Sequence, residues 1–294
     1  IIWFVILFVI ALVVTKLLDW ESLISGSGIP QLEGELAGKI DAKWWRVLIA
    51  KFFGGFLANF SGLALGREGP SIQLGAMVGK GIGKVLKRGK TEERYLLTCG
   101  ASAGLAAAFH APLAGVMFAL EEVHKHFSTP LLISVMTSSI AADYLMSSIL
   151  GMAPVFSFNI HGTLPTQYYW MVIILGIILG LLGAFYNKAL LFVQSLYNHS
   201  KHLNNYTKLL IPFILAGILG FTVPQLLGSG DTLVDLLIEG KLTMSLILLL
   251  LAGKFLFAIT CFGSGAPGGI FFPLLVIGCL IAVSYTHLTL PTTP

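Results

Sequence analysis

One carboxylate stands inside an apolar part of the chain, where its presence needs a chemical reason. Glu68 belongs to the sequence GREGP (66–70), which has apolar residues on both sides. A charged side chain within apolar membrane sequence is costly, so it is either paired or functional. Arg67 precedes it, but adjacent residues of a helix do not face one another. Because desolvation favours the neutral form of a carboxyl group, Glu68 is a candidate for a group that takes up and releases a proton.

Three short breaks rich in glycine and proline interrupt the apolar sequence, and each precedes a helical run. They are GSGIP (26–30), GREGP (66–70) and GGIFFP (268–273). Glycine lets the backbone turn, and proline is tolerated in a first helical turn, where its missing N–H costs nothing. Each break therefore predicts a helix that begins inside the protein. Converging helix N-termini, with their unpaired N–H groups and partial positive charge, make an anion site without a cation.

Residues of these breaks are the candidate anion ligands. The set is Ser27, Gly28, Ile29, Arg67, Glu68, Gly69, Ile270 and Phe271. The hydroxyl of Ser27 can donate one hydrogen bond to an anion, or it can cap the helix that follows. The alternative for the breaks is that they are ordinary kinks between packed helices. A single break would favour that alternative, and three breaks favour a site.

The composition requires a membrane protein. The chain has 294 residues, of which 56% are hydrophobic and 11% charged, and its mean hydropathy is +0.87. Soluble domains are about 25% charged, so this chain has too little polar surface to cover itself in water. A soluble globular enzyme, a disordered protein and a nucleic-acid-binding protein are excluded, and an all-α polytopic membrane protein is predicted. The three cysteines lie in apolar stretches without CxxC spacing, so neither a metal site nor a disulfide framework is expected. No cofactor is expected either.

The apolar segments differ in length more than those of a simple helical bundle. They are 1–18, 45–65, 69–86, 95–109, 111–123, 130–150, 168–197, 207–227, 243–262 and 270–282. A bilayer-spanning helix needs about 20 residues, so several are short, and interrupted helices of this kind are typical of transporters. The excess of Lys and Arg places 39–46, 80–94, 124–126 and 201–208 in the cytoplasm. The loop 151–168 has no Lys or Arg and is placed outside.

The chain contains an internal repeat. Residues 47–75 align with residues 250–278 at an offset of 203, which pairs Lys51 with Lys254. A Gly-Ser-Gly turn precedes each of these lysines, at 26–28 and at 228–230. An odd number of spans separates the two units, so they are expected to insert with opposite orientation, as inverted repeats do. Both lysines are expected to pair inside the protein, with Glu33 as a candidate partner, or to tune the local field.

These motifs resemble the signature regions of the CLC family of chloride channels and transporters. The matching sequences are GSGIPQLEG (26–34), GREGP (66–70), AAAFHAPLAGVMFALEE (106–122) and GSGAPGGIFFP (263–273), in the order and spacing of that family. The resemblance covers essentially all of 1–282. It implies an inverted-repeat CLC-type fold with broken helices meeting at the midplane, and a homodimer with a separate pathway in each subunit. It also implies further helices after residue 282, including one whose tyrosine helps to hold chloride.

The resemblance also implies roles for individual residues. Ser27 becomes a central anion ligand that prefers chloride, and Glu68 the gating glutamate that occupies the anion site until protonation releases it. Ile270 and Phe271 would serve through their backbone N–H groups, with side chains lining the pathway. Exchangers of the family tend to carry glutamate at the position of Glu122, whereas channels carry an apolar residue there. Glu122 therefore implies a point where protons enter from the cytoplasm.

Three alternatives accompany this interpretation. Glu121 and Glu122 can instead form a solvated or salt-bridged acidic pair at a helix end. Within the same family, the alternative to chloride/proton exchange is a passive chloride channel, and Glu122 favours exchange. A GxGD intramembrane aspartyl protease is suggested by GSGD (228–231), but its second aspartate could only be Asp143, and the repeat already explains the turn. The prediction is a transporter of chloride and protons, not an enzyme, embedded in the lipid of a prokaryotic plasma (inner) membrane.

The two ends of the chain predict a truncated membrane domain. The sequence opens inside an apolar run at Ile1, so residues 1–282 are expected to be a transmembrane domain cut at both ends. Residues 283–294 read VSYTHLTLPTTP, which resembles the in-frame translation of a transposon end and sequencing adapter. This segment is therefore expected to be a non-native tail, and the alternative is a natural β-prone or loop tail.

Overall fold

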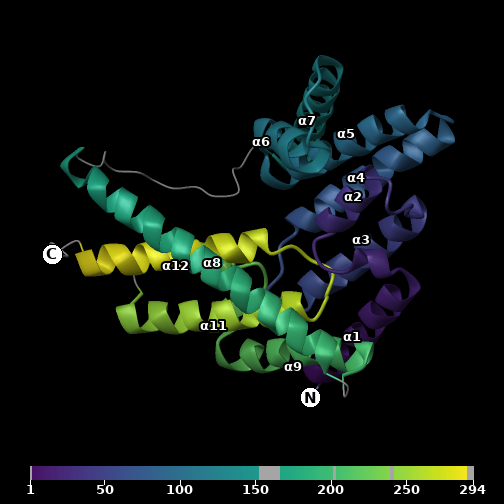
Figure 1. Cartoon of the computed structure of the whole chain (residues 1–294). Helices are drawn as coiled ribbons and strands as arrows, with labels where there is room; N and C mark the ends of the chain where they lie inside the picture. The colour runs from purple at the N-terminus through teal and green to yellow at the C-terminus, as the bar shows by residue number, and fades with distance from the viewer. Residues whose placement is uncertain (1, 152–165, 201–202, 239–241, 290–294) are drawn as a thin grey trace.

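The computed structural model is helical throughout the residues it describes, which are 2–151, 166–200, 203–238 and 242–289 (Figure 1). The first half holds α1 (Ile2–Trp20), α2 (Ile29–Leu36), α3 (Trp44–Phe60), α4 (Glu68–Val85), α5 (Lys90–Phe109), α6 (Pro112–Phe118) and α7 (Thr129–Leu150). The second half holds α8 (Tyr169–His199), α9 (Asn205–Thr222), α10 (Asp231–Ile238), α11 (Met244–Gly263) and α12 (Phe271–Thr289). The predicted all-α fold is confirmed.

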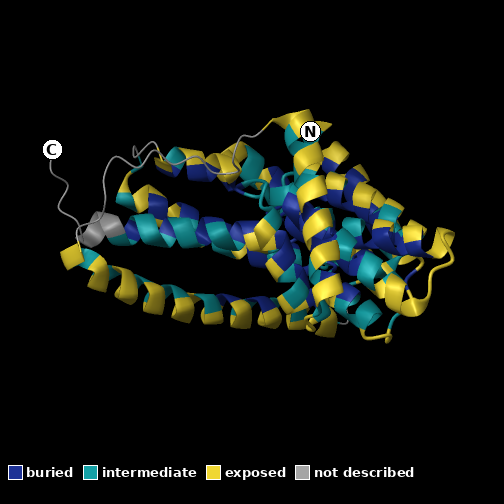
Figure 2. Cartoon of the chain, turned by 90° about the horizontal axis from the view of Figure 1, so that it is seen from above, coloured by how far each residue is buried: buried dark blue, intermediate teal, exposed yellow. Residues whose placement is uncertain are grey.

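Five of the described helices are long and apolar enough to cross a membrane: α1, α7, α8, α9 and α11. Their outward residues are largely exposed, whereas buried residues lie between packed helices in each half and in a cluster that joins the two halves (Figure 2). Exposed Leu, Ile and Phe side chains on these helices suit contact with lipid tails. The loop 151–168 is predicted to lie on the external side of the membrane, and most of its residues are not among those that the structure describes.

Helices α4 and α5 pack backbone against backbone because glycine lines their contact. A methyl group at Gly75 or Gly79 of α4 would collide with the backbone of α5, and one at Gly100 or Gly104 of α5 would collide with that of α4. Small residues at such contacts are typical of packed membrane helices, since they let the backbones approach closely. This tight pair fixes the start of α4, where Glu68 lies.

The repeat predicted from the sequence is visible in the arrangement of the helices. The packed pair α3 and α4 in the first half corresponds to the pair α11 and α12 in the second (Figure 1). The short helix α2 follows the first Gly-Ser-Gly turn, and α10 follows the second. Helix α10 lies outside the apolar segments predicted from the sequence, since it is only 8 residues long.

Candidate functional site

The two halves meet at one pair of equivalent glycines. Gly66 and Gly269 form an antiparallel bridge in which each N–H donates to the other's carbonyl oxygen, with both N···O distances 2.7 Å. The two residues occupy the same position in the two repeats. A reciprocal contact between equivalent residues is what a two-fold relation between two units produces. The predicted opposite orientation of the repeats is thus present at their junction.

The first break joins the same junction. The N–H of Gly268 donates to the carbonyl oxygen of Gly26 at 3.0 Å. Gly69 packs against Ser27 so closely that a methyl group there would lie 2.8 Å from the Cβ of Ser27. Backbone contacts therefore bring together the three breaks and the N-termini of α2, α4 and α12.

Glu68 is the first residue of α4, and its side chain is 3% exposed. Its carboxylate lies against the Gly66–Gly269 bridge: a methyl group at Gly269 would stand 2.6 Å from Oε2, and one at Gly66 would overlap both oxygens. Neither oxygen has an ion pair or a well-aligned hydrogen bond among the described residues. The backbone N–H groups of Glu68 itself and of Phe272 supply the favourable interactions around it. This buried acid thus lies near backbone N–H groups at the start of two helices, and no described side chain forms an ion pair with it.

Ser27 lies at the start of α2, half-buried, beside the buried Gly28. Its Oγ accepts a hydrogen bond from the N–H of Ile29 at 3.3 Å, so in this state the hydroxyl caps α2. Gly28 has φ +90°, a left-handed conformation that a side chain would strain. A methyl group at Gly28 would also overlap Gln73 of α4, so the turn fits only glycine there.

The remaining candidate ligands differ in their exposure. Gly69 is buried, Ile270 is half-buried, and the side chain of Arg67 is exposed. Phe271 begins α12 and is 53% exposed, and its ring packs edge-on against Phe109 with 5.6 Å between centroids. The N-terminal turn of α12 therefore contributes backbone groups near Glu68 and an aromatic side chain beside them.

Two buried lysines donate hydrogen bonds to the backbone at the two Gly-Ser-Gly turns. The ammonium of Lys51 donates to the carbonyl oxygens of Ile24 at 2.8 Å and Gly26 at 2.6 Å. Lys254 repeats this contact at positions 226 and 228, at 3.1 and 2.7 Å. Both lysines are fully buried. Each lysine thus donates hydrogen bonds to carbonyl oxygens of its own turn, and these bonds fix the turn that precedes the next helix.

The expected pairing of Glu33 with a buried lysine is wrong. Glu33 forms an ion pair with Lys125 instead, 3.2 Å between Oε2 and Nζ. The physical reason is that carbonyl oxygens already surround the ammonium of Lys51.

Lys80 is a second exception, because the sequence analysis counted it in a solvated basic stretch. It is buried, and its ammonium contacts the carboxylates of Glu35 and Asp41, the latter at 2.8 Å. The hydrogen bond from Lys80 and its charge lower the pKa of Asp41, which lies in the loop after α2. The spacing of Lys80 from the buried Ile72 and Ala76 by full helical turns could have revealed its burial. These contacts tie the end of α2 to α4.

Glu122 lies on a π-helical turn, Ala119–His124, that follows α6. Its side chain is exposed, as is that of Glu121, and neither forms an ion pair or hydrogen bond with a described residue. The neighbouring His124 ring contacts the hydroxyl of Thr98 at 3.0 Å. Glu122 and Glu68 are therefore on separate elements with no direct bond between them.

The two aspartates that a protease would need are not paired. Asp231 accepts a hydrogen bond from Ser229 at 2.9 Å, and Asp143 contacts His110 at 3.2 Å. His110 is the C-cap residue of α5, with φ +51°. The alternative of a GxGD protease therefore lacks a pair of catalytic aspartates among the described residues.

Inverted repeats whose broken helices meet N-terminus to N-terminus define a class of integral membrane transport protein. A sequence profile described as voltage gated chloride channel matches residues 6–294. The chain belongs to this family, the CLC family of chloride channels and exchangers, and it is not an enzyme.

Bacterial relatives agree with this assignment. The chain is 38% identical over 268 residues to the H(+)/Cl(-) exchange transporter ClcA of Vibrio parahaemolyticus, covering 89% of this chain and 57% of that protein. It is 37% identical over 267 residues to the ClcA of Vibrio cholerae, with the same coverage. The chain thus spans little more than half the length of these relatives.

Solved structures share the fold. A slow cyanobacterial Cl-/H+ antiporter superposes with a TM-score of 0.92 at 35% identity, over 99% of this chain and 70% of that one. A CLC-type fluoride/proton antiporter superposes with a TM-score of 0.83 at 22% identity, covering 98% of this chain and 72% of that chain, which speaks for the fold alone. The predicted CLC-type architecture is confirmed.

Proposed function

We propose that the protein exchanges chloride for protons, with Glu68 as both gate and proton carrier. The observation that carries this proposal is the buried carboxylate of Glu68, seated among the N–H groups where the breaks meet. An anion and a carboxylate require the same donors, so they compete for this position. Protonation removes the charge that holds the side chain there. Chloride then takes the vacated position, and loss of the proton restores the gate.

The ligands of chloride in this proposal are backbone N–H groups and one hydroxyl. Gly28, Ile29, Gly69, Ile270 and Phe271 supply N–H groups around the junction, while Arg67 adds positive charge from outside it. Ser27 would rotate its hydroxyl from the N–H of Ile29 toward the anion, so its cap and its ligand role belong to different states. Dipoles without a full charge suit a site that must also release its ion.

Glu122 is proposed as the carboxylate that takes up protons from the cytoplasm. Its side chain is exposed and has no ion pair with a described residue, so its carboxylate is accessible from the solution. The named exchange transporters among the relatives favour exchange over a passive channel. A homodimer in the inner membrane of a prokaryote is part of the same proposal, supported by the bacterial relatives.

The test records chloride and pH together on liposomes that contain the protein. Glu68→Gln has almost the same shape but cannot exchange a proton, so chloride should still pass while chloride-driven proton movement disappears. Glu122→Gln should also stop protons, yet it should keep the pH dependence of chloride flux because Glu68 still titrates. Robust proton pumping in Glu68→Gln would refute the mechanism. Chloride movement without protons in the unmutated protein would replace exchange with a channel.

A further inference from the structure

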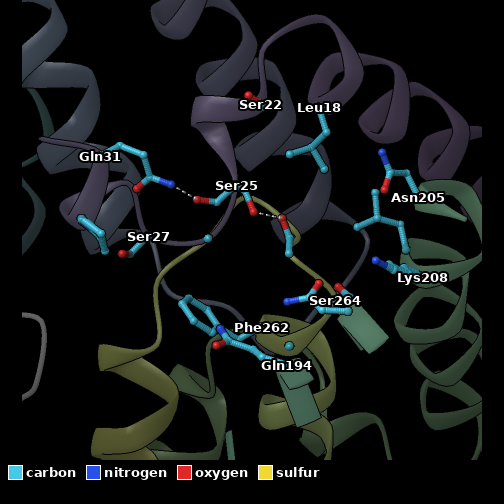
Figure 3. A pocket seen from close by; sticks show the side chains of 16 residues that line it. Leu18, Ser22, Ser25, Ser27, Gln31, Gln194, Asn205, Lys208, Phe262 and Ser264 are labelled. Atoms are coloured by element: carbon cyan, nitrogen blue, oxygen red, sulfur yellow. Dashed lines mark hydrogen bonds between the residues drawn. The ribbon is translucent and has the colours of Figure 1, made fainter. Parts of the chain in front are cut away.

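We infer that Lys208 captures chloride in a polar cavity on the cytoplasmic side and passes it to the site at Ser27. This inference rests on the proposed function and adds a residue to its chloride pathway. The cavity lies between the ends of α1, α8 and α11 and the start of α9, and Ser27 and Gly26 form part of its wall (Figure 3). Its volume is about 460 Å³, far more than one chloride needs.

The lining of this cavity is polar and carries one formal charge. Its polar side chains come from Ser22, Ser25, Ser27, Gln31, Gln194, Asn198, Asn205, Lys208 and Ser264. Hydroxyl and amide groups can donate to an anion, and no carboxylate is among the sixteen lining residues to repel one. Lys208 is therefore the one formal charge among the residues that line the cavity.

The charge of Lys208 is not neutralised within the described part of the chain. Its ammonium has no ion pair or hydrogen bond there, whereas Lys51 and Lys254 donate to carbonyl oxygens and Lys125 pairs with an acid. The nearby Asp19 accepts a hydrogen bond from Asn205 at 3.0 Å and does not line the cavity. Figure 3 shows the Lys208 side chain extending from α9 toward the cavity.

A lone ammonium at the mouth of a polar cavity attracts anions over a longer range than hydrogen bonds do. Low-dielectric walls focus its field and raise the local chloride concentration, which speeds association. The flexible stem of lysine and its single point charge hold an anion loosely, so the ion can move on to Ser27. The Lys-rich segment 201–208 is on the predicted cytoplasmic side, which assigns this capture step to chloride arriving from the cytoplasm.

The experiment measures flux driven from the side of the cavity against chloride concentration, with the protein reconstituted in liposomes. Lys208→Gln should raise the half-saturating chloride concentration about two- to tenfold and weaken its dependence on ionic strength, while the maximal flux changes little. Lys208→Arg keeps the charge and should stay close to the unmutated protein. Lys43→Gln removes an exposed cytoplasmic charge that does not line the cavity, and should change neither quantity.

Each failure has its own meaning. If the unmutated protein moves no chloride, the proposed function fails. If it moves chloride and Lys208→Gln leaves the half-saturating concentration and its salt dependence unchanged, the capture role of Lys208 is overturned. If Lys208→Gln and Lys208→Arg impair transport equally, the side chain acts through packing and the inference is also wrong.

Discussion

Gly66→Ala should displace the side chain of Glu68, the proposed gate, while leaving Glu68 itself unsubstituted. The three atoms nearest to a Cβ built at Gly66 all belong to the carboxyl group of Glu68, with Cδ 2.6 Å away. Gly66 lacks a positive φ, and both of its bridge hydrogen bonds use the backbone. Alanine therefore suits the backbone conformation at this position, and its nearest conflict is with the carboxyl group of Glu68.

The size of the effect follows from this overlap. Carbon atoms pack best at about 3.5–4.0 Å, so the carboxyl group must retreat by about 1 Å or more. Overpacking of this kind costs typically about 1–3 kcal/mol. If only the seated conformation bears this cost, its population relative to the displaced one falls about 5- to 150-fold. Replacing glycine at a position with a compatible backbone conformation stabilises a protein by about 0.4–1 kcal/mol, because the unfolded chain loses conformational freedom. This gain offsets part of the packing cost, so the global stability should change little.

The assay compares chloride flux and chloride-driven proton movement at neutral and acidic pH. In Gly66→Ala the flux at neutral pH should approach the flux at acidic pH, and fewer protons should move per chloride. Gly83→Ala, which lies on α4 and has ordinary contacts to its neighbours, is the control. A folded Gly66→Ala protein with unchanged coupling and pH dependence would show that the seated carboxylate does not block chloride.

Two further changes test the neighbouring parts of the site. Ser27→Pro should raise nitrate flux relative to chloride flux because the hydroxyl donor is lost, and unchanged selectivity in liposomes would exclude Ser27 as a ligand. Lys51→Met and Lys254→Met should both lower the melting temperature, since each removes the ammonium that donates to two carbonyl oxygens of its turn, and a buried carbonyl group left without a donor costs about 1–3 kcal/mol. An effect confined to one lysine would contradict their equivalent roles, and Lys43→Met should have no effect.

The sequence was sufficient to predict the parts of the site that depend on backbone geometry. Glycine and proline at a break state a local conformation, so GREGP at 66–70 and GGIFFP at 268–273 predicted helix starts that the structure has at Glu68 and Phe271. The repeat offset alone paired Gly66 with Gly269, and these residues form the bridge. Local chemistry and internal symmetry are both readable without knowledge of the packing.

Charge pairing was less predictable because it depends on which helices become neighbours. Glu33 and Lys125 are 92 positions apart, and nothing in either local sequence indicates their contact. Lys80 was assigned to a solvated stretch by composition, yet it lies buried between the end of α2 and α4. The partners of a charged side chain are set by tertiary structure, whereas its effect on a helix start is set locally.

The two halves share a scaffold but carry different chemistry at equivalent positions. The offset that pairs the two bridge glycines also pairs Glu68 with Phe271, so a single titratable group lies beside a junction that is otherwise symmetrical. Ser27 has Ser229 as its counterpart, but that hydroxyl donates to Asp231, an acid at the start of α10. The carboxylate of Asp231 at that helix N-terminus takes the place that an anion would occupy, and its negative charge repels any free anion. In the proposed mechanism, one anion site with one proton-carrying group, instead of two symmetrical sites, would follow from divergence at a few positions of a duplicated fold.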